Sequence, residues 1–103
     1  METAFTIIPD SSGNHDYFTF QGNIDAQAET LLKELPREIR RPLVTFDFSK
    51  TGRINSMGIA LLLRCLKTIK EEKSAEIRLL HVSPMNTMLF KMTGLLLLAD
   101  LGK

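Results

Sequence analysis

One hydroxyl group, that of Ser56, stands where a covalent modification would have a large effect on this chain. It lies within residues 47–63, DFSKTGRINSMGIALLL, where a buried strand is expected to give way to an amphipathic helix. The start of a helix offers unpaired backbone N–H groups and the positive end of the helix dipole, so a phosphate on Ser56 would be held there. A partner docking on that helix end would meet new charge. The position indicates a switch rather than a catalyst.

Asp47 is the carboxylate nearest to this hydroxyl in sequence, at the carboxyl end of the expected strand. A phosphoacceptor aspartate of the receiver type needs a Mg²⁺ site with further carboxylates near the first strand, where Asp10 stands alone. We expect Asp47 instead to accept hydrogen bonds from loop N–H groups near Ser49 and Thr51, and so to shape the approach to Ser56.

Catalytic and metal-binding functions lack the residues that they need. A nucleophile elbow around Ser56 would require glycine where Ile54 stands, and neither histidine has an evident orienting partner. Cys65 is the only cysteine, so an internal disulfide is excluded, and no cluster has metal-ligand spacing. We therefore expect no enzyme activity, no cofactor and no metal, with Cys65 as a small buried thiol.

The composition is that of one ordinary globular domain. The chain has 103 residues, 44% of them hydrophobic and 24% charged, with a formal net charge of +1. A chain of this length forms one core, so residues 1–103 are expected to be a single domain. The near-zero charge gives no reason to expect nucleic-acid binding. The N-terminus has no signal-peptide pattern and no stretch approaches a membrane span, so we expect a cytoplasmic protein without membrane insertion.

The first half of the chain predicts a hairpin, a helix and a central strand. Residues 5–8 and 17–21 are β candidates separated by the turn-rich residues 9–14, and they are expected to pair antiparallel. From Asp25, a predicted N-cap, apolar residues recur at helical spacing as far as Pro36. Residues 43–48 form a short aromatic and β-branched run, which predicts a strand buried on both faces.

The second half alternates helix and strand. The apolar stripe from Ile59 to Ile69 predicts an amphipathic helix, for which either Asn55 or Ser56 can be the N-cap. Residues 77–82 predict another buried strand. Ser83 and a following proline start a third helix that ends at Gly94. Its methionines are expected in the core, although Met57 on the preceding helix and Met88 would form an adaptable contact surface if exposed.

Together these elements predict an α/β fold with a mixed sheet of four to five strands flanked by helices. The strands after residue 43 should be parallel and joined by right-handed crossovers, and the first hairpin makes the sheet mixed.

Several of these segments resemble the STAS domain of anti-sigma factor antagonists. The resemblance rests on Asp47-Phe48-Ser49, Ile54-Asn55-Ser56, Gly58-Ile59 and Leu62, the strand at 77–82, and the helix end Met92-Thr93-Gly94-Leu95, together with YFTFQGNID at residues 17–25. It spans most of the chain.

The resemblance implies a small non-enzymatic protein that binds a cognate anti-sigma factor of the ATP-binding serine kinase type. Phosphorylation of a serine, Ser56 by position, separates the pair, and a separate serine phosphatase restores it. The residues expected to contact the partner are Asp47, Ser49, Asn55, Ser56, Met57 and Gly58. Gly58 either lets a partner approach Ser56 closely or permits tight packing against a strand.

The chain departs from the family pattern in two places. Such antagonists often carry aspartate before the phosphorylated serine, where this chain has Asn55. The closing C-terminal helix is expected to be shortened or absent, because residues 95–101, LLLLADL, are followed by only two more residues. These leucines complete the core, or they leave apolar surface that a partner or a second copy in a homodimer covers.

A second function remains open at this stage. A constitutive assembly subunit of a transporter or sensory complex would use the same surface without phosphorylation, with Ser56 acting only as a helix cap.

Overall fold

The strands of this protein form one mixed sheet with helices packed against it, as the alternating pattern predicts. A computed structural model describes residues 4–10 and 13–102. The strands are β1 (Thr6–Asp10), β2 (Asp16–Ile24), β3 (Leu43–Asp47), β4 (Thr51–Ile54), β5 (Glu76–Leu80) and β6 (Asp100–Leu101). The helices are α1 (Glu29–Glu34), α2 (Ser56–Lys73) and α3 (Pro84–Thr93), with 3₁₀ turns at Ala26–Ala28, Leu35–Glu38 and Leu95–Leu97.

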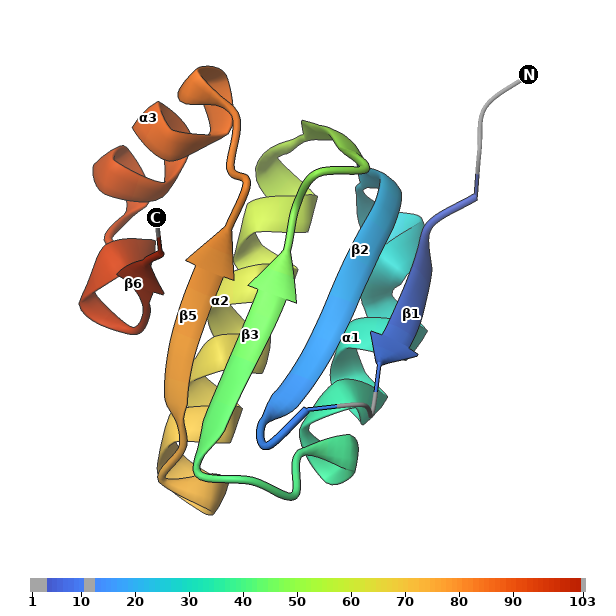
Figure 1. Ribbon diagram of the computed structural model, residues 1–103. Helices are drawn as coiled ribbons and strands as arrows, with labels where there is room; N and C mark the ends of the chain where they lie inside the picture. The colour runs from blue at the N-terminus through green and yellow to red at the C-terminus, as the bar shows by residue number, and fades with distance from the viewer. Residues whose placement is uncertain (1–3, 11–12, 103) are drawn as a thin grey trace.

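The order of strands in the sheet is β1-β2-β3-β5-β6, and β4 pairs with the end of β2. The first pair is antiparallel, with Thr6 opposite Gln21, and the pairs β2·β3, β3·β5 and β5·β6 are parallel. Figure 1 shows α1 and α2 on the same face of the sheet, whereas α3 lies at the end that carries β5 and β6. The predicted α/β fold with a mixed sheet is confirmed.

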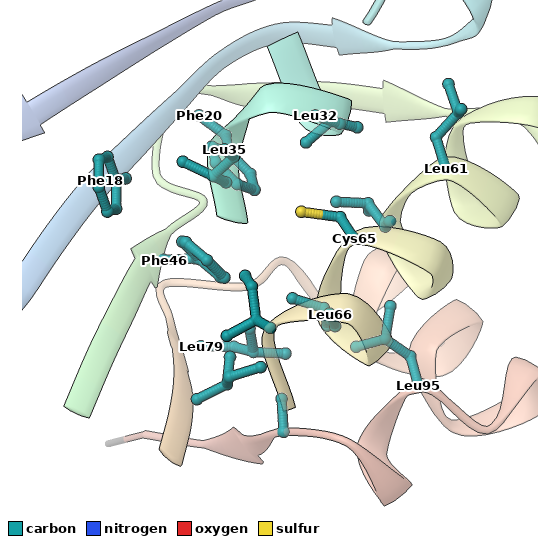
Figure 2. Packing of buried hydrophobic residues seen from close by; sticks show 14 of the residues in the cluster. Phe18, Phe20, Leu32, Leu35, Phe46, Leu61, Cys65, Leu66, Leu79 and Leu95 are labelled. Atoms are coloured by element: carbon teal, nitrogen blue, oxygen red, sulfur yellow. The ribbon is translucent and has the colours of Figure 1, made fainter. Parts of the chain in front are cut away.

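Side chains that alternate along β2, β3 and β5 form the core under the helices. On β3 the opposite face is buried as well, at Thr45 and Asp47, so the predicted burial of this strand on both faces is confirmed. Phe18, Phe20, Val44, Phe46 and Leu79 are all buried and point toward the helices. The rings of Phe20 and Phe46 stack with centroids 5.0 Å apart. Figure 2 shows these rings beside leucines of α1 and α2, with the sulfur of Cys65 directed into the same cluster. Burial raises the pKa of the Cys65 thiol to about 12, so Cys65 is the buried neutral thiol expected.

The helix boundaries follow the sequence signals. The Asp25 side chain caps the first turn by accepting the Gln27 N–H at 2.9 Å, although the segment that follows is divided between a 3₁₀ turn, α1 and a second 3₁₀ turn. Ser83 caps α3, and Gly94 ends it with a φ of 82°, in the left-handed region that favours glycine. These local signals were sufficient because each depends on neighbouring residues only.

Four expectations require correction or extension. The first strand continues through Pro9 to Asp10, so only part of the predicted turn remains, and residues 11 and 12 lie outside the described residues. Strand β4 was not predicted, because the run TGRI has no apolar alternation and its partner β2 is distant in sequence. The C-terminal leucines form a 3₁₀ turn that leads into β6; Leu95 is buried, which confirms that they contribute to the core, but Leu97 is 89% exposed.

The prediction of core methionines on α3 is wrong. Met85, Met88 and Met92 are 77%, 60% and 77% exposed. The inward side of α3 is instead formed by Phe90 and Asn86, four residues apart and both buried. The apolar stripe of α3 therefore faces outward.

Candidate functional site

Asn55, the residue before Ser56, is the N-cap of α2. Its side-chain Oδ1 accepts the Gly58 N–H at 2.8 Å, and its backbone is extended. This contact resolves the alternative between Asn55 and Ser56 as caps. Ser56 is the first residue of the helix, and its side chain is exposed. Within residues 4–10 and 13–102 its hydroxyl makes no hydrogen bond, so a hydroxyl at a helix start is left available.

Gly58 lies on the inner side of the same turn. It is buried, and a Cβ built on it would lie 1.9 Å from the carbonyl oxygen of Ile24. The Asn55 N–H donates to that same oxygen at 3.2 Å. Of the two interpretations of Gly58, this geometry supports tight packing, because the absent side chain lets the start of α2 rest on the end of β2.

Asp47, at the end of β3, links the connection between β3 and α2 to the neighbouring strand by hydrogen bonds. Its Oδ1 accepts the Ser49 N–H at 2.8 Å, and its Oδ2 accepts the Tyr17 hydroxyl from the neighbouring strand. The predicted bond from the Ser49 N–H is therefore confirmed. The predicted bond from the Thr51 N–H is wrong, because this group donates to the Phe48 carbonyl at 3.1 Å.

The hydrogen bonds to Asp47 set the protonation of both partners. Desolvation of this buried carboxyl opposes its charge, but the bonds from Tyr17 and Ser49 outweigh it and hold the pKa of Asp47 below its ordinary value. The same bond, with desolvation and the carboxylate charge, raises the pKa of Tyr17 to about 12. Asp47 is thus a charged acceptor that anchors the connection.

Further bonds fix the rest of this connection to the sheet. The Thr51 hydroxyl donates to the Phe20 carbonyl at 2.8 Å, and the Arg53 N–H donates to Asn23 Oδ1 at 2.8 Å. From α3, Asn86 Nδ2 donates to the Gly52 carbonyl at 3.4 Å. Sequence reasoning missed Asn23 and Asn86, since neither lies near Ser56 in the chain. The pairing of β4 with β2 brings Asn23 there, and the position of α3 brings Asn86 there.

The structure divides the six residues expected to contact a partner into two kinds. Ser49, Asn55, Ser56 and Met57 are exposed along the connection and the first turn of α2, and Met57 is 52% exposed. Asp47 and Gly58 are buried and lie beneath them. A partner docking here would touch the exposed residues, whereas the buried pair sets their positions.

This arrangement is suited to holding or repelling an anion. The exposed first turn of α2 presents the positive end of an 18-residue helix, with Lys50 and Arg53 exposed on the preceding connection. Among the described residues, no group of three or more His, Cys, Asp or Glu side chains is placed to hold a metal ion. Nor is any helix of the described chain both long enough and apolar enough to cross a membrane.

The chain matches the model of a known α/β domain family. The STAS domain model matches residues 9–101, and the chain belongs to the STAS domain family. The resemblance seen in the sequence is thereby confirmed. No curated protein sequence matches the chain.

Solved structures with the same fold include several anti-sigma factor antagonists. The chain is similar to an anti-sigma factor antagonist from Mycobacterium paratuberculosis, with a TM-score of 0.74, 17% identity, and coverage of 94% of this chain and 84% of that one. For an anti-sigma factor antagonist STAS domain protein from Planctomyces limnophilus, the TM-score is 0.72, the identity 19%, and the coverage 94% and 90%. For the phosphorylated form of the Bacillus cell fate determinant SpoIIAA, the TM-score is 0.62 and the identity 15%, with coverage of 95% of this chain and 92% of that one. At these low identities, it is the TM-scores that show a shared fold.

Proposed function

We propose that this protein is an anti-sigma factor antagonist in a partner-switching pathway, and that its unphosphorylated form binds an anti-sigma factor that is also an ATP-binding serine kinase. Phosphorylation of Ser56 by that kinase releases the complex, and a serine phosphatase resets it. The protein acts as a binding module in the cytoplasm, not as an enzyme, and needs no cofactor. The observation that carries the proposal is the exposed, unbonded hydroxyl of Ser56 at the first position of α2.

The fold and its neighbours support this assignment. The STAS family model covers most of the chain, and two similar structures are those of SpoIIAA in an unphosphorylated and in a phosphorylated form. In this chain the corresponding switch needs only local chemistry. A phosphate brings about −1.5 to −2 charges and three acceptor oxygens.

The energy required for such a switch is small. A hundredfold loss of affinity corresponds to about 2.8 kcal/mol, which one desolvated charge opposite an unprepared surface can cost. Because Ser56 does not cap the helix, its modification leaves the Asn55 cap intact, so release requires no unfolding of α2.

The alternative, a constitutive subunit of a larger assembly, assigns Ser56 the function of a helix cap. That function belongs to Asn55 in this chain. Under the alternative, a partner would bind the same surface, but phosphorylation of Ser56 would not regulate the binding. The two proposals therefore differ in whether modification of Ser56 changes the affinity for the partner.

The test is to incubate the purified protein with a candidate kinase and ATP, and to locate added phosphate by mass spectrometry. Phosphate is expected on Ser56 and absent from Ser56→Ala. Ser74→Ala is the matched control, because Ser74 is an exposed serine at the far end of α2 and its loss should leave phosphorylation unchanged. Phosphate on another residue, or none, would contradict the assignment of Ser56.

Affinity measurements then separate the two functions. Ser56→Ala is expected to bind the kinase and to resist release by ATP, whereas Ser56→Asp is expected to bind weakly. Equal affinity of wild type, Ser56→Ala and Ser56→Asp in a calorimetric titration would favour the constitutive subunit.

A further inference from the structure

An apolar groove runs between α3 and β4, next to the start of α2. Its volume is about 470 Å³, and it is partly open to solvent. Strand β4 contributes Arg53 and Ile54, the two residues before Asn55, and α3 contributes its exposed methionines. The lining residues are Arg53, Ile54, Met85, Asn86, Met88, Leu89 and Met92.

The methionines give this groove an unusual surface for an isolated domain. Met85, Met88 and Met92 are each at least 60% exposed. Exposed apolar side chains gathered in one patch mark interaction sites, and methionine is the residue that best adapts its shape to a partner. A stripe at positions i, i+3 and i+7 of one helix presents its side chains in a row, which suits an elongated apolar segment.

The charged side chain that lines the groove, Arg53, is basic, and so are those on the segments that form it. The chain has 12 acidic residues, and none of them falls within residues 48–70 or 77–99, the segments that contain β4, the first turns of α2 and the whole of α3. Arg53 in the groove, Lys91 on α3 and Lys50 before β4 are exposed. Within the described residues none of these three cations has an ion-pair partner. These exposed cations on the segments that form the groove complement an acidic partner.

The groove is continuous with the proposed switch and is held in a fixed shape. Arg53 and Ile54, which line it, are followed directly by Asn55 and Ser56. Two side chains brace its walls: Asn23 accepts the Arg53 N–H at 2.8 Å, and Asn86, buried between the walls, donates to the Gly52 carbonyl at 3.4 Å. A preformed groove binds without the cost of ordering its own backbone.

We propose that this groove docks an acidic amphipathic segment of the protein that binds at Ser56, with apolar side chains of the segment on the methionines and a carboxylate on Arg53. The inference rests on the proposed function for the identity of that protein as the anti-sigma kinase. It adds a second contact region to the exposed start of α2 and names the chemistry that recognises it. It also explains why phosphate at Ser56 repels the partner, since new negative charge would appear beside the rim that attracts an acidic segment.

The proposal is tested by titrating the purified candidate kinase with four full-length variants. Met88→Gln/Met92→Gln removes apolar contacts, and Arg53→Glu reverses the charge. Leu97→Gln is the apolar control, because Leu97 is 89% exposed and lies outside the groove. Lys67→Glu is the charge control, as an exposed cation farther along α2. We expect each groove variant to weaken binding at least tenfold and each control by less than twofold, with the Arg53→Glu loss shrinking as salt concentration rises.

The outcomes separate the groove from the switch. Unchanged affinity for the groove variants, with binding still lost in Ser56→Asp, would overturn the groove and leave the proposed function in place. No binding of the kinase to wild type would refute the proposed function, and the groove assignment would fail with it. Self-association of wild type in sedimentation, abolished by Met88→Gln/Met92→Gln, would show that a second copy covers the groove and would overturn the acidic occupant. Circular dichroism spectra identical to wild type confirm that each variant is folded.

Discussion

Two helices of this protein begin with a serine, and the two serines have different environments. Ser83 is the cap of α3, and its Oγ accepts the Asn86 N–H at 3.1 Å. Ser56 is one position later relative to its helix, because Asn55 has taken the cap of α2. The first hydroxyl holds a helix end, whereas the second makes no hydrogen bond within the described residues.

The comparison indicates how a helix start can be both stable and modifiable. The capping bond contributes about 1 kcal/mol and needs only a short polar side chain before the first turn. When asparagine supplies it, the next residue keeps the favourable dipole environment without a structural duty. A phosphate on Ser83 would have to break the α3 cap, but a phosphate on Ser56 would not.

The largest effect is expected from Gly58→Ala, which tests whether the α2 start depends on close packing. The added Cβ would lie 1.9 Å from the Ile24 carbonyl oxygen, so the helix must move away from β2. We expect the free energy of unfolding to fall by about 3 kcal/mol, a typical cost of overpacking, in urea denaturation.

The control for that variant is Gly13→Ala, where the nearest atom to an added Cβ is 3.7 Å away. It should change stability by less than about 0.5 kcal/mol. If Gly58→Ala were equally mild, packing would not explain the glycine, and close approach of a partner would be the remaining interpretation.

The second-largest effect is expected at Asp47, whose carboxylate anchors the connection into α2. The connection into α3 is only the short segment between the end of β5 and Pro84. Removing the charged acceptor in Asp47→Asn should cost about 2 kcal/mol at neutral pH, the range for hydrogen bonds to charged groups. Because the pKa of Asp47 is lowered on folding, this advantage is present above the ordinary value of 3.8 and is lost as pH falls through the lower folded value.

Stability curves measured by urea denaturation from pH 7 to pH 2 check this prediction. The wild-type curve should converge on that of Asp47→Asn in acid. Tyr17→Phe, which keeps the Ser49 bond, should lie between them at pH 7. Parallel curves at all pH values would show that Asp47 is not a charged anchor.

A direct test of the two serines comes from Ser83→Ala and Ser56→Ala. We expect the first to lower the free energy of unfolding by about 1 kcal/mol through loss of a cap. The second should change it by less than about 0.5 kcal/mol, as for a surface position. Equal losses in the two variants would mean that Ser56 has a structural function.

Local signals made much of this molecule predictable. The cap at Ser83, the stop at Gly94 and the buried run at residues 43–48 depend on neighbours in the chain, and each was confirmed to within a residue. The choice between Asn55 and Ser56 as cap could not be made from sequence, because both side chains accept the same kind of bond. The structure identifies Asn55 as the cap through the Gly58 N–H, which donates to Asn55 Oδ1.

The features that the sequence did not reveal depend on contacts between distant segments. The pairing of β4 with β2 places Asn23 beside Arg53, and no periodicity in TGRI indicates it. The orientation of α3 was missed because its methionine stripe has the spacing of a core face, but Phe90 and Asn86 occupy the inner side. An amphipathic pattern indicates that a helix has an apolar face without saying what that face contacts.

The smallest effect is expected from Asn55→Asp, which places aspartate, common at this position in related antagonists, beside Ser56. Asn55→Asp keeps a side-chain oxygen for the Gly58 N–H, so stability should change by no more than about 0.5 kcal/mol. The added charge should instead act on phosphorylated Ser56. A phosphoserine has a second pKa of about 6, and a neighbouring carboxylate disfavours its dianion, so this pKa should be a few tenths higher in Asn55→Asp than in wild type. Phosphorus NMR titration measures both values, and the difference should shrink in high salt because the two charges are exposed to solvent. An unchanged pKa would place the phosphate away from residue 55, and the helix start would then not hold it.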